Sequence, residues 1–117
     1  MLGADDVERA VTFWMQALGY RPVRLPDAAN GFTILVPPTG EGTRVALQRA
    51  ETPPEDHPRA HVDLVVDDAA EQAAEIERLI GLGATRVAWD SYPTDPDFVV
   101  LADPEGNRFC VVDASHG

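Results

Sequence analysis

The second half of the chain changes its hydrophobic period in a way that predicts a helix between strands. Residues 61–66 are rich in β-branched side chains and predict a strand. Asp68 and Glu71 then have the spacing of a capping box, which predicts a helix over residues 69–80. The helix is expected to bury a stripe made of Ala69, Ala73, Ile76 and Ile80. Further strands are expected near residues 85–89, 97–102 and 107–112.

The first half predicts the same order of elements. Asp5 or Asp6 caps a helix that Gly19 ends, and its apolar face carries Val7, Ala10, Val11, Trp14 and Leu18. Strands are expected near residues 20–25, 31–36 and 43–49. The strand before this helix covers only residues 1–4, and the counterpart of His61 would precede Met1. Three explanations stay open: a clipped chain, a misassigned start, or a short strand.

The two halves also share sequence. Residues 41–45 are similar to residues 105–109, and residues 32–38 are similar to residues 98–104. The join falls in residues 50–58, which are rich in proline and acidic residues. We therefore expect an α+β fold built from two βαβββ modules within one domain, residues 1–117. The first module covers residues 1–50 and the second covers residues 60–113.

Composition excludes several classes of protein. The 117 residues carry a formal net charge of −11, which disfavours binding to nucleic acid. Lysine is absent, so Schiff-base, pyridoxal-phosphate and Walker-A chemistry are excluded. No apolar run reaches the length of about 20 residues that a membrane helix needs, and no secretion signal opens the chain. Cys110 is the single cysteine, so a reducing cytoplasm is the expected location.

Three segments carry a resemblance to a known family: residues 13–20, 60–67 and 101–110. They resemble the glyoxalase/bleomycin-resistance/dioxygenase proteins, the vicinal oxygen chelate superfamily, and in particular its glyoxalase-like subgroup. The resemblance implies two curved mixed sheets around a central cavity, and a homodimer. It leaves the chemistry open, because this fold hosts isomerases, lyases, dioxygenases and metal-free binding proteins.

The resemblance also implies where a metal ion would bind. In enzymes of the superfamily, a histidine begins the first strand of each module, and a carboxylate or amide stands on each last strand. His61 matches the histidine of the second module, and Cys110 occupies the usual carboxylate position. In the first module, Gln48 offers an amide oxygen on the same strand face as Ala46. His61 and Gln48, with Cys110 as a thiolate, fall short of a full ligand set. We therefore expect no high-affinity metal site and no required cofactor.

Other side chains are candidates for a ligand pocket. Asp63 shares a strand face with His61, while Trp89 and Tyr92 flank a proline-rich loop and either wall a cavity or pack the loop. Trp14 falls on the apolar helix face, where a core position is favoured over a pocket position. Cys110 is more typical of a small core residue than of a nucleophile.

Two further pairs are interpreted as structural. Arg44 and Arg108 are equivalent in the repeat, and bonding across hairpins is favoured over binding of an anionic substrate. Asp103 and Glu105 are interpreted as solvated turn residues and not as an acid–base pair.

Two functions follow from these observations. The first is a binding protein without a catalytic metal, whose small ligand is aromatic or, given the acidic surface, cationic. The second is a metal-dependent enzyme of the glyoxalase, lyase or dioxygenase type, with His61 and Gln48 as ligands. A third possibility is that the chain is a fragment of a larger enzyme.

Overall fold

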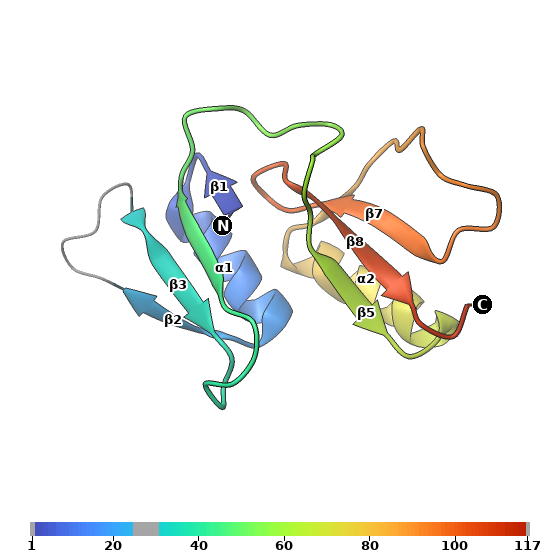
Figure 1. Ribbon diagram of the computed structural model, residues 1–117, viewed down its shortest axis with the longest axis horizontal. Helices are drawn as coiled ribbons and strands as arrows, with labels where there is room; N and C mark the ends of the chain where they lie inside the picture. The colour runs from blue at the N-terminus through green and yellow to red at the C-terminus, as the bar shows by residue number, and fades with distance from the viewer. Residues whose placement is uncertain (1, 25–30, 117) are drawn as a thin grey trace. The chain divides into compact units, whose positions relative to one another are not determined.

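The computed structural model describes residues 2–24 and 31–116. The chain divides into two compact units, Met1–Pro54 and Glu55–Gly117, and the division lies inside the predicted connector of residues 50–58. Each unit contains a four-stranded mixed sheet with one helix packed on one face (Figure 1). This confirms the predicted α+β class.

The first unit follows the predicted order of elements, with strand order β1-β4-β3-β2. Strand β1 is parallel to β4, and the other neighbours are antiparallel. The elements are β1 (Leu2–Ala4), α1 (Val7–Leu18), β2 (Arg21–Arg24), β3 (Thr33–Val36) and β4 (Val45–Arg49). Met1 and Leu25, at the ends of two predicted strands, lie outside the described residues.

Helix α1 begins and ends where local chemistry predicts. Asp6 is its N-cap, because the carboxylate accepts a hydrogen bond from the Arg9 backbone N–H at 3.1 Å. Gly19 ends the helix in the left-handed region, with φ of 69°. The helix buries five side chains against the sheet: Ala10, Val11, Phe13, Trp14 and Ala17.

The second unit repeats this topology, with strand order β5-β8-β7-β6 and β5 parallel to β8. The elements are β5 (Asp63–Val66), α2 (Ala69–Leu82), β6 (Thr85–Arg86), β7 (Phe98–Ala102) and β8 (Arg108–Asp113). In the described part of the chain, no helix combines the length and apolar character needed to cross a bilayer.

Both side chains of the predicted capping box accept backbone hydrogen bonds at the start of helix α2, although Glu71 reaches Asp67 and not the N-cap residue Asp68. The Asp68 carboxylate accepts from the Glu71 N–H at 2.8 Å, and the Glu71 carboxylate accepts from the Asp67 N–H at 3.0 Å. The predicted apolar stripe is wrong in part, because Ala69 and Ala73 are exposed.

The buried face of helix α2 runs instead through Ile76 and Leu79 and includes Gln72. The Gln72 Nε2 donates to the Val111 carbonyl at 3.0 Å and to the Asp97 carbonyl at 3.2 Å. A pattern of apolar positions does not reveal this face, because one of its members is polar.

The strand predicted over residues 85–89 is shorter, since β6 contains only Thr85 and Arg86. Beyond β6, the edge of β7 is occupied by a side chain: the Tyr92 hydroxyl accepts the Val100 N–H at 2.8 Å. The chain after Arg86 therefore covers the sheet edge with loop residues and does not extend the strand.

The turn between β7 and β8 corrects another expectation. Asp103 is 2% exposed and Glu105 is 9% exposed, so neither is a solvated turn residue. The Asp103 carboxylate accepts from the backbone N–H groups of Glu105 and Asn107, at 2.9 and 2.8 Å. Its burial follows from this role, because it satisfies backbone donors that the tight turn leaves unpaired.

Candidate functional site

One face of the second sheet gathers polar side chains from two strands. Side chains alternate along a strand, so Arg108, Cys110 and Val112 of β8 share a face. In the register, Cys110 lies between Asp63 of β5 and Val100 of β7. The parallel pairing of β5 with β8 therefore brings distant parts of the sequence to one place.

This face borders a cavity of about 440 Å³. Trp89, Phe98 and Val100 supply apolar wall, and His61 and Asp63 supply polar groups. The remaining lining residues are Pro58, Ser91, Asp97, Arg108, Phe109, Cys110 and Val112. A mostly apolar hollow with a few converging polar groups is typical of a small-molecule site.

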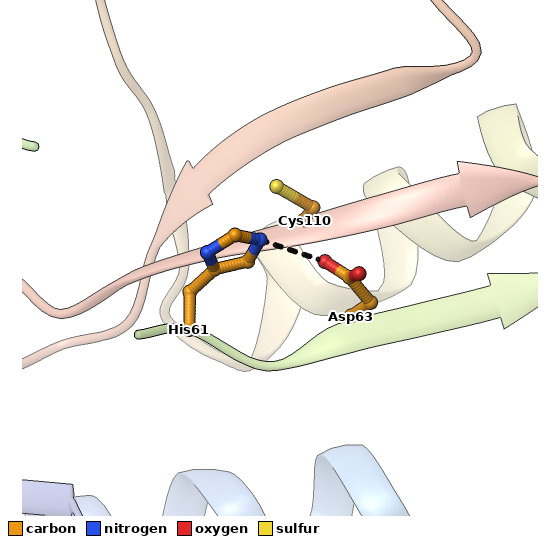
Figure 2. Close-up of side chains that lie close together, drawn as sticks. All are labelled: His61, Asp63 and Cys110. Carbon is orange, nitrogen blue, oxygen red and sulfur yellow. Dashed lines mark ion pairs between the residues drawn. The ribbon is translucent and has the colours of Figure 1, made fainter. Parts of the chain in front are cut away.

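His61, Asp63 and Cys110 meet at this face, as Figure 2 shows. The His61 Nε2 lies 3.0 Å from a carboxylate oxygen of Asp63. One potential ligand atom from each residue lies within 4.8 Å of the other two. Cys110 is buried, whereas the His61 and Asp63 side chains are 43% and 52% exposed, so the cluster is open on one side.

The Cys110 thiol holds its proton in this environment. Burial raises its pKa to about 11, and the negative charge of Asp63 and a hydrogen bond to Asp63 act in the same direction. At neutral pH the group is a thiol, which is a poor nucleophile.

The donor set of this cluster fits a divalent metal ion. An imidazole nitrogen, a carboxylate oxygen and a sulfur are ligands that zinc accepts, at about 2.0 to 2.3 Å each. Ligand atoms within 4.8 Å of one another suit an ion placed between them. Asp63 was predicted as a pocket residue and not as a metal ligand; in a metal site it would supply the carboxylate oxygen, and its alternation with His61 was the signal.

The predicted aromatic residues have different surroundings. Trp89 lines the cavity and packs against the His57 ring at a centroid distance of 4.7 Å. Tyr92 is not among the lining residues; its ring contacts Phe98 at 5.3 Å. Phe98 also lines the cavity, and the sequence analysis did not predict this. Its signal was the alternation of side chains along β7, which places Phe98 and Val100 on the same face.

Two predicted site residues belong to the first unit. Trp14 is 1% exposed and packs edge-on against Phe13 at 5.1 Å, so it is a core residue. Gln48 lies on β4, half-buried, opposite Gly3 of β1.

Comparison with solved structures shows the same fold. The chain is 26% identical to a glyoxalase/bleomycin resistance protein/dioxygenase superfamily member from Sphaerobacter thermophilus, with a TM-score of 0.66 and coverage of 96% of this chain and 91% of that one. A family enzyme from Burkholderia phytofirmans gives 18% identity and a TM-score of 0.70, with 96% and 93% coverage. A genomically encoded fosfomycin resistance protein from Listeria monocytogenes gives 11% identity and a TM-score of 0.70, with 95% and 84% coverage.

Comparison by sequence gives two results. No curated protein matches the chain significantly. A family model described as a glyoxalase-like domain matches residues 1–112, which confirms the resemblance that the sequence motifs carry. The chain therefore belongs to the glyoxalase-like domain family.

Proposed function

We propose that this chain is a small-molecule-binding protein whose ligand occupies the cavity of the second unit. The observation that carries the proposal is the cavity of about 440 Å³, with Trp89 and Phe98 in its wall and His61 and Asp63 among its polar groups. This volume lies in the range of small-ligand sites, and a flat aromatic body would pack against the two rings.

The relatives support a small-molecule ligand. Two proteins of the same fold are described as fosfomycin resistance proteins, from Listeria monocytogenes and Mesorhizobium loti. Their identities to this chain are 11% and 16%, so the similarity shows a shared fold only. The ligand of this chain has to be found by experiment.

Blocking the cavity tests the proposal. A library of planar aromatic fragments is titrated into the protein while two-dimensional NMR follows residues 85–113. We expect binders to shift cavity resonances of the wild type and to bind at least tenfold more weakly to Val112→Phe, which places a bulky ring where the ligand would lie. Ala73→Phe is the control, because Ala73 is exposed on helix α2 and does not line the cavity. Equal binding to Val112→Phe and wild type would place the ligand elsewhere.

A metal-dependent lyase, isomerase or dioxygenase is the second candidate, favoured by the cluster of His61, Asp63 and Cys110. These three side chains would hold the ion and leave a position open for substrate. A bound divalent ion supplies Lewis-acid polarisation of a substrate oxygen. The Asp63 carboxylate would also fix the orientation of the His61 ring.

Elemental mass spectrometry after dialysis separates the two functions. The enzyme requires close to one equivalent of a divalent metal in the wild type, lost in His61→Ala and kept in the control His116→Ala. His116 pairs with Asp95, away from the cluster. Absence of metal from all three proteins, even after incubation with excess ion, favours the binding protein.

Three accompanying expectations remain proposals. We expect a homodimer, because the short strand β1 lies at the edge of the first sheet, and light scattering that finds the mass of a single chain would contradict it. We expect a reducing cytoplasmic location for a protein whose one thiol is free. The acidic composition taken alone favours a cationic ligand, but the charged groups that line the cavity, and not the net charge of the chain, decide which ligand binds there.

A further inference from the structure

A cation stands in the wall of this otherwise acidic protein's cavity. Arg108 begins β8, and strand alternation places its side chain on the same face as Cys110. The Arg108 side chain is only 19% exposed, so most of it is removed from water. A guanidinium in such a place needs acceptors for its five N–H donors.

Arg108 has fewer acceptors than its donors require. Within residues 2–24 and 31–116, its Nε is the buried side-chain polar atom that lacks a hydrogen-bond partner. Its Nη2 donates to one carboxylate oxygen of Asp56 at 3.2 Å. Asp56 is 87% exposed, and an ion pair with so exposed a partner is weak.

Asp56 reaches Arg108 from the segment that borders the cavity. The next residue, His57, pairs with Asp90 at 2.8 Å and packs on Trp89. Pro58 follows and lines the cavity itself. Asp56 is not a lining residue, but its carboxylate shows that an acid group can reach the guanidinium from this segment.

We propose that the ligand of this cavity is a small organic acid, whose carboxylate replaces Asp56 on the Arg108 guanidinium while its flat apolar body packs against Trp89 and Phe98. This inference rests on the proposed binding function and names the ligand class. A planar acid suits the planar fork of a guanidinium, and binding requires the side chain to turn so that the buried Nε meets the incoming oxygen. The ligand thereby supplies the acceptor that Nε lacks.

The carboxylates of the cavity give a rival prediction. Asp63 is paired with His61 at 3.0 Å, whereas Asp97 lines the cavity and would face a cationic ligand. The charge of the ligand therefore distinguishes Arg108 from Asp97 as the anchoring group.

Three probes of equal shape test the charge: benzoate, benzamide and benzamidine, each titrated into the wild-type protein and followed by NMR. We expect benzoate to bind about tenfold tighter than benzamide, since it makes charge-assisted hydrogen bonds. Arg108→Gln should remove this preference, and Arg108→Lys should keep part of it. Arg86→Gln is the control, because Arg86 pairs with Glu77 on the surface.

Asp56→Asn provides a variant at an exposed position, where folding is not at risk. Freed of its competitor, Arg108 should bind benzoate about threefold tighter, with benzamide unchanged. Glu55→Gln removes the same charge from the neighbouring residue and should have no such selective effect.

The outcomes of these titrations test the acid ligand and the proposed binding function separately. Equal binding of benzoate and benzamide, a preference that survives Arg108→Gln, or tightest binding of benzamidine overturns the acid ligand but keeps the binding site. If none of the three probes shifts the cavity resonances, both the inference and the proposed function fail.

Discussion

The two units share one topology and differ in the chemistry on equivalent sheet positions. In the first unit, Ala46 of β4 lies opposite Ile34 of β3; in the second, Cys110 of β8 lies opposite Val100 of β7. Arg108, the repeat partner of Arg44, is largely buried in a strand, whereas Arg44 is exposed before β4 begins. The repeat therefore preserves the order and pairing of the strands, while the turn lengths and the side chains on a sheet face differ.

The two helices also differ in the side chains that they bury. Helix α1 buries two aromatic rings, Phe13 and Trp14, whereas α2 buries Ile76 and Leu79 and directs Gln72 to backbone carbonyls. The first unit thus has the more aromatic core, and the second has the more polar site. The following substitutions test this division.

The largest effect is expected from the two tryptophans. Trp14→Ala should lower the free energy of unfolding by about 3 to 5 kcal/mol, because it empties a fully buried position. Trp89→Ala should cost less stability and weaken fragment binding, because Trp89 lines a cavity. Urea unfolding measures the first effect and NMR titration the second. Equal losses of stability in the two variants would mean that Trp89 packs in the core as Trp14 does.

Cys110 sharpens the contrast with Ala46. In metal-free protein, a pKa raised from 9.0 to about 11 lowers the thiolate fraction about a hundredfold, so alkylation by iodoacetamide at pH 8 should slow accordingly. Asp63→Asn should speed alkylation, because it removes a negative charge and a hydrogen bond. The urea-unfolded chain is the reference.

The raised pKa of Cys110 also predicts how the stability of the fold changes with pH. The folded state keeps the Cys110 proton longer than the unfolded state, so stability is retained below pH 9 and falls as pH rises toward 11. Cys110→Ala should flatten that fall. An unchanged profile would mean that the thiol titrates alike in both states.

Gln72 tests the polar face of α2. Gln72→Ala should cost about 1 to 3 kcal/mol of unfolding free energy, since the Val111 carbonyl loses its side-chain donor. Ala73→Gln places the same side chain at an exposed site and should change stability by less than about 0.5 kcal/mol. Chemical denaturation measures the unfolding free energy of both variants. An unchanged value for Gln72→Ala would mean that the hydrogen bonds of Gln72 do not stabilise the second unit.

The smallest effect is expected where β8 ends. The hydroxyl of Ser115 donates to Asp113 at 2.7 Å and lowers the pKa of that carboxyl below 3.8. The resulting stability is present above pH 3.8 and is lost as pH falls through the lower folded value. Ser115→Ala should therefore narrow the difference between urea midpoints at pH 7 and pH 3. The first unit has Arg49 at the end of β4, so the effect belongs to the second unit alone.

Local features of the sequence predicted most of the fold. The capping residue Asp68 and the terminating Gly19 act within a few residues of themselves, so their positions are visible without the rest of the chain. The similarity of residues 41–45 to residues 105–109 predicted a repeated topology, because similar sequences favour similar local structure. The predictions of burial were wrong for residues such as Asp103, which is buried, and Ala73, which is exposed. Burial depends on which other segments pack against a residue, and this is not visible in the local sequence.

The candidate site shows the limit of that reasoning. The sequence by itself determined two βαβββ units and the presence of His61, Asp63 and Cys110, because residue types and short-range periods are local properties. Only the tertiary structure decided that these three meet, since the register of β5 with β8 joins Asp63 to Cys110. It likewise set Asp56 against Arg108, 52 residues away. Charge and ligand chemistry arise from such long-range pairs, which burial and sheet register select and which no local pattern encodes.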